Sequence, residues 1–419
     1  MKAHIVSLGC PKNLTDSEVL MGQLVSEGYS ITNDPSEAEM IVVNTCAFLK
    51  SAREESLSVI NEMAAWKNIG KCQKLYVAGC LPKYSNKPLK DVDEFIDSID
   101  LYSCKIPRVK ATRPWTAYVK IAEGCNNRCT YCLIPSIRGK LRTRKVSDIL
   151  SEVKNLAKNG VKEVIYVAQD TTAHPKFVEL LKKTAKIKGI RWIRIMYTHP
   201  KHISAKLIET IAKEKKIVKY IDMPIQHASD KILKAMGRKY PPTSSFGSLR
   251  SLRTSLGAGD RNTIEILLKC LRDKVSGIAI RTSLIVGFPG ETEKDFNELV
   301  DLVKTAKFDR LGVFPYSRED KTPAGKMNGQ VSEKVKKSRV DKLMKIQAGI
   351  SLNKNRSFIG KKMEVIIEGK KGKYFVGRTY RDAPEIDGNA LLRSDNKKTY
   401  GDVVNLYVTA ANIYDLFCK

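Results

Sequence analysis

The sequence lacks any long apolar run. Nowhere in its 419 residues do 18 or more apolar residues follow one another, so no transmembrane helix is expected. The first residues, MKAHIVSLGC, carry one lysine and lead into a strand-like run, without the apolar core of a secretory signal. We therefore expect a cytoplasmic protein with no membrane partner, in which the ten cysteines are thiols or metal ligands rather than disulfides.

The sequence is also poor in acidic residues. It has 45 Asp and Glu against 74 Lys and Arg, which gives a formal net charge of +29. This imbalance predicts a polyanionic partner such as RNA or a ribosome surface. The lysines are scattered, however, and ordinary solvated helix faces explain the charge equally well. With 42% hydrophobic residues, the chain can bury two or three cores and is not of a disordered type.

A fourth cysteine is missing from the most cysteine-rich part of the sequence. The stretch EGCNNRCTYCLIP places Cys125, Cys129 and Cys132 in a C-x₃-C-x₂-C pattern, with no further cysteine close behind. Closed zinc and iron–sulfur sites normally use four protein ligands. Three thiolates leave one metal position open, and chemistry takes place at an open position.

The first hundred residues carry three more cysteines in equivalent places. The runs HIVSLGC, MIVVNTC and KLYVAGC each indicate a strand that ends in a cysteine, namely Cys10, Cys46 and Cys80. Helical periodicity over 15–28 and 50–66 separates them, which predicts a βαβαβ arrangement with parallel strands. Because ligands bind at the carboxyl edge of such a sheet, we expect these three cysteines to converge there.

Six further strand–helix repeats fill roughly 107–352. We predict strands at AYVKIAE, EVIYVAQ, RWIRIMY, VKYIDMP, IAIRTSLIVGF and RLGVFPYS, with helices over 145–159 and 291–306. Eight such units would close a barrel, so six indicate an incomplete parallel β/α barrel with its active residues in the loops after the strands. The three-cysteine loop follows the first of these strands. The Ser-, Gly- and Arg-rich interval 239–262 is predicted to be a flexible loop.

The last segment, 355–419, has the pattern of a small antiparallel β-barrel. MEVIIEG, KYFVGRTY, NALLRS and VVNLYVTAAN indicate short strands separated by Gly, Asp and Asn turns. Such barrels often bind RNA or present loops to a protein partner, and a purely structural cap is the alternative. The predicted fold class is therefore α/β, with a parallel α/β domain at 1–106, a partial β/α barrel at 107–352 and a small β-barrel at 355–419.

The three-cysteine loop, with an aromatic residue before its third cysteine, resembles the radical S-adenosylmethionine signature. The resemblance implies that Cys125, Cys129 and Cys132 hold a four-iron, four-sulfur (4Fe-4S) cluster whose fourth iron binds S-adenosylmethionine. One electron from the reduced cluster would then yield a 5′-deoxyadenosyl radical that abstracts hydrogen from an unactivated carbon. Tyr131 would lie beside the bound adenine. VGFPGE resembles the segment that supports this cofactor, which adds Gly287, Gly290 and Glu291 as cofactor-binding candidates.

Nearly end to end, the chain resembles the radical S-adenosylmethionine methylthiotransferases. Members of this family combine a three-cysteine N-terminal domain, a radical core and a C-terminal TRAM barrel. The resemblance implies a second 4Fe-4S cluster on Cys10, Cys46 and Cys80, whose open iron carries an extra sulfur atom. One S-adenosylmethionine would methylate that sulfur, and another would generate the radical.

Two branches of this family differ in their substrate. One modifies an adenosine of tRNA, and the RimO-type branch modifies the β-carbon of an aspartate in the twelfth small-subunit ribosomal protein. The stretches LGCPKN, CLIPSIRGKLRTR, MPIQHASDKILKAMGR and GRTYRDAPEIDG resemble the second branch. This implies a ribosomal-protein partner and an electron donor such as flavodoxin or ferredoxin, and it leaves contact with rRNA open. The residues expected to contact the substrate are His227, Asp382, Glu385 and Asp387.

Several alternatives stay open at the level of sequence. The same chemistry could act on tRNA, or the chain could be a non-catalytic iron–sulfur or zinc protein that binds RNA. A sulfur inserter such as lipoyl synthase fits less well, because such enzymes lack a TRAM tail. His199, like His227, follows a predicted strand and is a candidate for a substrate contact or a structural hydrogen bond. The cysteines without ligand-like spacing are interpreted as structural: Cys72, Cys104, Cys270 and Cys418.

Overall fold

The computed structural model of the chain describes residues 1–96, 108–238, 240, 260–393 and 399–419. It contains two compact units. The first comprises Met1–Leu156, Tyr166–Gln169 and Ser317–Gly325, and the second comprises Ala157–Ile165, Asp170–Tyr316 and Lys326–Lys419. The three-domain division expected from the sequence stays a prediction. Cys104 and most of the predicted 239–262 loop lie outside the described residues.

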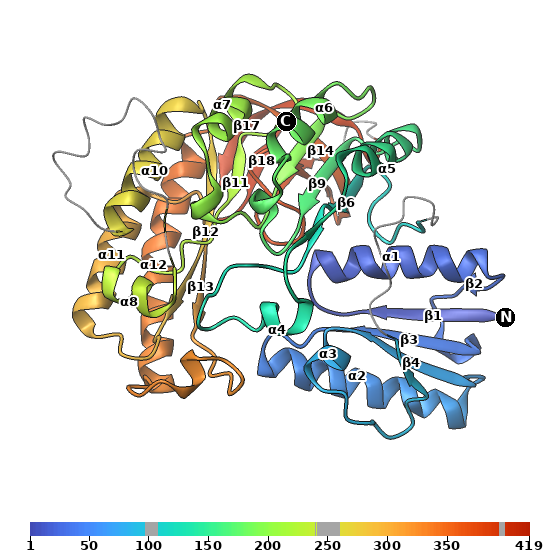
Figure 1. Cartoon of the computed structure of the whole chain (residues 1–419). Helices are drawn as coiled ribbons and strands as arrows, with labels where there is room; N and C mark the ends of the chain where they lie inside the picture. Colours follow the sequence, from blue (N-terminus) through green and yellow to red (C-terminus); the bar gives the residue numbers. More distant parts are fainter. Residues whose placement is uncertain (97–107, 239, 241–259, 394–398) are drawn as a thin grey trace. The chain divides into compact units, whose positions relative to one another are not determined.

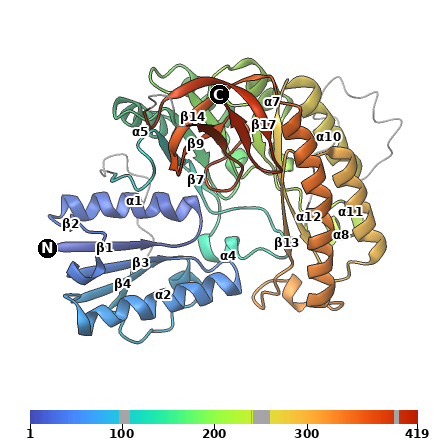
Figure 2. The ribbon, with the colours of Figure 1, turned by 180° about the vertical axis from the view of Figure 1, so that it is seen from behind.

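The first unit is built on a parallel sheet with the strand order β2-β1-β3-β4-β5 (Figure 1). Helix α1 covers one face of this sheet and α2 covers the other, as Figures 1 and 2 both show. Leu81 of α3 packs in the hydrophobic cluster on the α2 side. The predicted βαβαβ arrangement is confirmed. The strands are β1 (Lys2–Ser7), β2 (Ser30–Ile31), β3 (Met40–Thr45), β4 (Lys74–Gly79) and β5 (Glu94–Phe95), and the helices are α1 (Pro11–Ser26), η1 (Pro35–Glu37), α2 (Lys50–Ile69) and α3 (Leu81–Tyr84).

Strand β3 shows why this sheet is covered on both faces. Its residues Ile41, Val42 and Val43 are fully buried, as expected of a central parallel strand. Ile41 and Val43 pack with Ile60 of α2 on one face. Val42 packs with Leu20 of α1 on the other.

The same unit contains the segment that carries the three-cysteine loop. The antiparallel pair β7 and β8 places Glu123 opposite Arg142, and the cysteines lie in the chain between these two strands. The N–H of Ile121 donates to the carbonyl of Val167, which ties this segment to the end of β9. The elements here are β6 (Thr116–Lys120), β7 (Ala122–Glu123), α4 (Ile134–Arg138), β8 (Arg142–Thr143) and α5 (Val146–Lys158).

The second unit continues the alternation of strands and helices and includes a parallel sheet, β11-β12-β13. Its strands are β9 (Glu163–Val167), whose last residues belong to the first unit, β10 (Trp192–Ile195), β11 (Tyr220–Asp222), β12 (Ala279–Val286) and β13 (Arg310–Pro315). Its helices are η2 (Thr171–Ala173), α6 (Phe177–Ala185), η3 (Pro200–His202), α7 (Ala205–Lys213), α8 (Asp230–Ala235), α10 (Asp260–Lys274), α11 (Glu293–Ala306), η6 (Ala324–Lys326), which begins in the first unit, and α12 (Glu333–Arg356).

Helix α10 corrects one predicted boundary. The loop expected over 239–262 ends earlier, because α10 begins at Asp260. Ile264, Leu267 and Leu271 are buried and follow one face of this helix, and an apolar stripe with that spacing stabilises a helix against a core.

The end of the chain forms a closed barrel with the strand order β14-β15-β16-β18-β17, as the sequence predicted. The short strand β18 was not predicted, although it closes the barrel by pairing parallel to β16 and antiparallel to β17. Among the described residues, none of the helices is both long and apolar enough to cross a membrane. The barrel strands are β14 (Lys362–Lys371), β15 (Tyr374–Thr379), β16 (Ala390–Arg393), β17 (Val403–Ala411) and β18 (Leu416–Cys418).

Candidate functional site

The three N-terminal cysteines follow the carboxyl ends of three neighbouring parallel strands. Cys10 lies beyond β1 and directly before α1, Cys46 follows β3, and Cys80 follows β4 and precedes α3. A Cβ atom built on Gly9 would lie 2.8 Å from the Cβ and 3.2 Å from the Sγ of Cys46. The turns that carry Cys10 and Cys46 are therefore in contact, as the βαβαβ pattern predicted.

Buried polar side chains fix the backbone around these cysteines. The Asn13 side chain donates to the carbonyls of Leu8 (3.1 Å) and Thr45 (2.7 Å), which joins the ends of β1 and β3. The Thr45 hydroxyl donates to the carbonyl of Ala78 (2.6 Å) and accepts from the N–H of Leu81 (3.1 Å), which joins β3 to β4. The three cysteine-bearing turns are thus held together by the protein itself.

Burial disfavours the charged form of two of these thiols. It raises the pKa of Cys46, and it raises the pKa of Cys80 even though the guanidinium group of Arg138 opposes the shift. A metal ligand is the thiolate, so metal binding at these positions must release the protons.

The second set of cysteines lies on a loop held by backbone bonds. The N–H of Cys125 donates to the carbonyl of Gly139 (3.1 Å), and the N–H of Cys132 to the carbonyl of Cys129 (3.1 Å). Two backbone N–H groups approach the sulfur atoms: that of Asn127 lies 3.4 Å from Cys125 Sγ, and that of Ile134 lies 3.5 Å from Cys132 Sγ. Such donors stabilise the negative charge of a metal-bound thiolate.

Helix α4 brings this loop to the first set of cysteines. Leu133 and Ile137 are buried in the same hydrophobic cluster as Cys80 and Leu81. Both sets of three cysteines therefore belong to one compact unit. Tyr131 is half-buried in the loop, and its expected position beside an adenine ring stays a prediction.

Three thiolates in each set are soft ligands of the kind that iron–sulfur clusters use. Among the residues that the structure describes, no three His, Cys, Asp or Glu side chains lie close enough together to hold one metal ion. A zinc site would require each thiolate about 2.3 Å from the same ion. In a four-iron cluster each thiolate binds a different iron, so three thiolates stand farther apart. The chain thus offers two sets of three soft ligands in one compact unit.

The VGFPGE segment, predicted to support the cofactor, forms a tight loop in the second unit. Gly287 has a positive φ of 71°, and a Cβ there would lie 2.3 Å from Cγ of Lys336. The Glu291 carboxylate accepts from the N–H of Phe288 (3.0 Å) and from Arg339 (2.8 Å). Burial raises the pKa of Glu291 to about 7, although both donors favour the ionised form. Glu291 therefore supports its own loop, and cofactor contacts by Gly287, Gly290 and Glu291 stay predictions.

His227, which was expected to contact substrate, makes structural contacts inside the second unit. Its side chain is fully buried. Nδ1 accepts from the N–H of Ser229 (3.0 Å), which leaves the proton of the neutral ring on Nε2, 3.7 Å from Glu291 Oε2. Burial lowers the pKa of His227 to about 3, so the ring is neutral. His227 packs against Glu291 of the VGFPGE loop, and its expected contact with substrate stays a prediction.

His199 belongs to a second buried polar cluster. Its Nδ1 accepts from the N–H of Lys201 (3.1 Å), so the ring caps η3, and burial lowers its pKa to about 2. The neighbouring His202 bonds the buried carboxylate of Asp170 through Nδ1 (2.8 Å). Tyr197, in the same turn, has a positive φ of 57°, which is uncommon outside glycine and is concentrated at functional sites. A substrate contact by His199 stays open, and its capping bond is the structural role now visible.

Two of the three acidic residues expected to face the substrate are buried. Asp382 is 1% exposed and pairs with Arg310 of β13. Asp387 lies 3.5 Å from Arg281 and accepts from the hydroxyl of Tyr220 (2.7 Å). Both carboxylates bind the barrel to the strands beside it, and their expected contact with a basic protein stays a prediction. Glu385 is exposed and stays a candidate.

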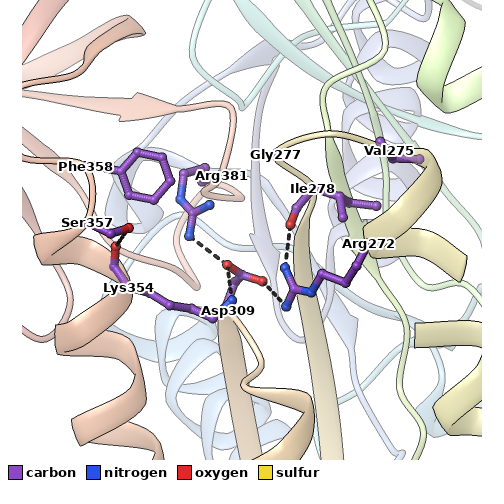
Figure 3. A pocket seen from close by; sticks show the side chains of 9 residues that line it. All are labelled: Arg272, Val275, Gly277, Ile278, Asp309, Lys354, Ser357, Phe358 and Arg381. Carbon is purple, nitrogen blue, oxygen red and sulfur yellow. Dashed lines mark hydrogen bonds and ion pairs between the residues drawn. The ribbon is translucent and has the colours of Figure 1, made fainter. Parts of the chain in front are cut away.

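A small cavity of about 200 Å³ lies where α12 meets the barrel (Figure 3). In its wall the Asp309 carboxylate binds Lys354 (3.0 Å), Arg381 (2.9 Å) and Arg272 (2.7 Å). Burial opposes ionisation, but these three cations lower the pKa of Asp309 to about 2. Arg381 also stacks on the ring of Phe358, 4.2 Å away. The arrangement joins the barrel to the rest of its unit through one shared anion.

Sequence reasoning missed the charged residues around the cysteines. Asp16, Lys120, Glu123 and Arg138 are all buried and joined by ion pairs. Arg138 stands in the stretch CLIPSIRG, which drew attention only as a family resemblance. Charged residues are almost always exposed, so nothing in the local sequence marked these four as buried.

Comparisons with known proteins agree with this geometry. Residues 119–303 match the Radical SAM superfamily, residues 2–99 match the uncharacterized protein family UPF0004, and residues 359–419 match the TRAM domain. A radical S-adenosylmethionine methyltransferase, TsrM of Kitasatospora setae, has a similar fold, with a TM-score of 0.55 at 12% identity over 77% of this chain and 73% of that one. The predicted fold class is confirmed.

Relatives that match nearly the whole chain identify its family more closely than the domain matches do. The ribosomal protein uS12 methylthiotransferase RimO of Acetivibrio thermocellus is 44% identical over 99% of this chain and 97% of that protein. The protein of the same name from Carboxydothermus hydrogenoformans is 44% identical over 99% of this chain and 98% of its own length. With this similarity along its whole length, the chain belongs to the RimO family of ribosomal protein uS12 methylthiotransferases.

Proposed function

We propose that this protein is a radical S-adenosylmethionine enzyme that methylthiolates the β-carbon of an aspartate in ribosomal protein uS12. The observation that carries the proposal is the similarity to RimO proteins over 99% of the chain. The placement of two three-cysteine sets in one compact unit supports it. A tRNA substrate is not favoured, because the relatives named above act on the ribosomal protein.

Each set of cysteines has its own role in this proposal. Cys125, Cys129 and Cys132 hold the 4Fe-4S cluster that binds S-adenosylmethionine. The second 4Fe-4S cluster, which carries the sulfur to be transferred, is held by Cys10, Cys46 and Cys80. When bound, these groups supply reductive cleavage of S-adenosylmethionine, a hydrogen-abstracting radical and a methylated sulfur atom.

The residues of the chain prepare the site for that chemistry. Each cysteine set supplies three thiolates, so one iron of each cluster stays accessible to a ligand from outside the protein. Asn13 and Thr45 fix the cysteine turns before any metal binds. Burial of Cys46 and Cys80 limits the access of water to the sulfur atoms. Tyr131 orients the adenine.

The partners follow from the substrate. We propose that uS12, free or in the small ribosomal subunit, binds the enzyme in the cytoplasm, and that the excess of basic residues contacts rRNA. A flavodoxin or ferredoxin supplies the electrons. The division into an N-terminal cluster domain (1–106), a radical core (107–352) and a TRAM barrel (355–419) gives each function its own part of the chain.

Mass spectrometry of uS12 tests the proposal directly. A strain without this gene should contain unmodified uS12, and the wild-type gene should restore a mass increase equal to one methylthio group in place of hydrogen, located on an aspartate. A Cys125→Ala gene should not restore it. Full modification of uS12 in the deletion strain, or a methylthio group lost from tRNA adenosine instead, would show that the assigned substrate is wrong.

A further inference from the structure

Arg138 follows one cysteine set in the chain and reaches the other set through its guanidinium group. It stands six residues after Cys132, at the end of α4, and its side chain is 4% exposed. Its Nε and one terminal nitrogen donate to Cys80 Sγ at 3.3 and 3.2 Å. The same terminal nitrogen also bonds Asn13 Oδ1 (2.5 Å). One edge of the planar guanidinium group thus faces the sulfur of a cysteine that lies 58 residues away in the sequence.

The other side of Arg138 is fixed by a buried charge network. Its remaining terminal nitrogen donates to Asp16 Oδ2 at 3.2 Å. Lys120 bonds both Asp16 and Glu123, and Gln169 donates to Glu123 Oε1 (2.6 Å). These two cations and two carboxylates pair with one another, and all four side chains are buried. Arg138 therefore has a fixed orientation, and its donors toward Cys80 do not depend on a mobile side chain.

The backbone that carries Arg138 is equally fixed. Leu133 and Ile137, on the same helix, pack in the cluster that contains Cys80 and Leu81. The helix continues directly from the loop of Cys125, Cys129 and Cys132. A movement of that loop would therefore move the guanidinium group that bonds Cys80.

We propose that Arg138 is a positioning residue for the second cluster, which holds Cys80 in its ligating orientation and makes that cluster easier to reduce. This rests on the proposed function, in which Cys10, Cys46 and Cys80 bind that cluster. Hydrogen bonds to ligand sulfur atoms and a nearby positive charge favour the reduced, more negative state of an iron–sulfur cluster. Loss of both should shift its potential to a more negative value.

The test measures the second cluster by itself. In full-length protein with Cys125, Cys129 and Cys132 changed to alanine, only the second cluster should assemble after anaerobic reconstitution. In this background we compare Arg138→Met, which removes charge and donors, with Arg138→Lys, which keeps the charge and one donor group. Lys140→Gln is the matched control, because Lys140 is exposed and only two residues away. Iron content and an EPR-monitored redox titration are the readouts.

We expect the midpoint potential to become more negative in Arg138→Met, less so in Arg138→Lys, and to stay at the parent value in Lys140→Gln. If Arg138→Met does not retain iron, Arg138→Lys should recover it, with both variants folded by circular dichroism. An unchanged potential at full iron content in Arg138→Met overturns the inference. Iron loss in both Arg138 variants together with loss of the fold overturns it as well, since Arg138 would then be purely structural.

If the proposed function is wrong, the same reconstitution experiment gives a different result. If the parent with the three alanines binds no iron, the second cluster does not exist, whatever Arg138 does. If the parent binds about four irons and the Arg138 variants have the same iron content and midpoint potential as the parent, the function stands and this inference alone is wrong.

Discussion

At the scale of single residues, the position before a cysteine is as restricted in residue type as the cysteine position itself. Gly9, Gly79 and Gly124 precede Cys10, Cys80 and Cys125, and all three have a positive φ. Gly9 shows a second constraint, because a Cβ there would lie 2.8 Å from the Cβ of Cys46. Any side chain at position 9 must push apart the two turns that carry Cys10 and Cys46.

We therefore expect Gly9→Ala to lose the second cluster and about half of the bound iron. Gly28→Ala is the matched control. Gly28 also has a positive φ, of 92°, but nothing lies within 4 Å of the added Cβ, so this change costs only about 1 kcal/mol of backbone strain. Iron analysis after anaerobic reconstitution separates the two, and equal iron in both variants would refute contact between the turns of Cys10 and Cys46.

The two cysteine sets should also give different losses of activity. Alanine at Cys125, Cys129 or Cys132 should abolish formation of 5′-deoxyadenosine, because each thiolate holds one iron of the cleaving cluster. A triple Cys10, Cys46 and Cys80 alanine variant should continue cleavage but form no methylthiolated uS12. Cys72→Ala, which removes a buried thiol outside both sets, should keep both activities. Methylthiolated product from the triple variant would exclude a second cluster on these cysteines.

At the scale of secondary-structure elements, buried ion pairs attach the barrel to its neighbouring strands. Glu163 of β9 is fully buried and bonds Arg194 of β10 (2.8 Å) and Arg378 of β15 (2.5 Å). Burial would raise its pKa, but Arg378 and Arg194 lower the pKa of Glu163 to about 2. Since the pKa of this acid is depressed on folding, its contribution to stability is present above the unfolded value and is lost as the pH falls toward 2.

We expect Glu163→Gln to lower the free energy of unfolding by roughly 3–5 kcal/mol at neutral pH, because it leaves the buried guanidinium group of Arg194 without its anion and leaves Arg378 paired with Glu368 alone. The difference in the free energy of unfolding between this variant and the wild type should become smaller as the pH falls from about 4.5 to about 2. Glu179→Gln, which breaks an exposed pair with Lys183, should leave the free energy of unfolding nearly unchanged, because water and salt screen an exposed pair. Denaturant unfolding across this pH range measures both, and a difference that is independent of pH would contradict the charge role of Glu163.

The same ion pairs change how substrate docking can be tested. Deleting 355–419 would leave the buried charges of Glu163, Asp309 and Arg310 without their barrel partners, so the truncated chain should be unstable. A surface substitution is therefore the better test. We expect Glu385→Lys to slow the modification of basic uS12 while the formation of 5′-deoxyadenosine continues. Asp341→Lys, the same charge reversal at an exposed position of α12, should modify uS12 normally. Equal rates in the two variants would remove Glu385 from the docking surface.

At the scale of the whole molecule, the net charge of +29 is the dominant property. Contact with rRNA would release counterions, so the logarithm of the affinity for the small subunit should fall linearly with the logarithm of the salt concentration. The slope reports the number of phosphates neutralised. Sedimentation of the enzyme with small subunits over a salt series measures it. An affinity that does not change with salt would exclude the proposed rRNA contact.

The sequence by itself determined the order of the elements and indicated which cysteines are candidate ligands. Cys10, Cys46 and Cys80 end apolar runs that alternate with helical periodicity, and such local patterns set both the strands and the edge where ligands gather. The spacing of Cys125, Cys129 and Cys132 indicated an open metal position before any fold was known. These signals are local, because strand formation and ligand spacing depend on residues close together in the chain.

Only the tertiary structure decided which charged residues are buried and what they bind. Asp382 and Asp387 belong to an acidic, turn-rich stretch that indicates a surface, yet Arg310 and Arg281 from distant strands enclose them. Arg138 stands in a basic stretch, and its bond to Cys80 spans 58 residues. A buried charge is stable only where opposite charges and hydrogen-bond partners meet it. Those partners come from remote segments, so the packing of the chain, and not its local pattern, places them.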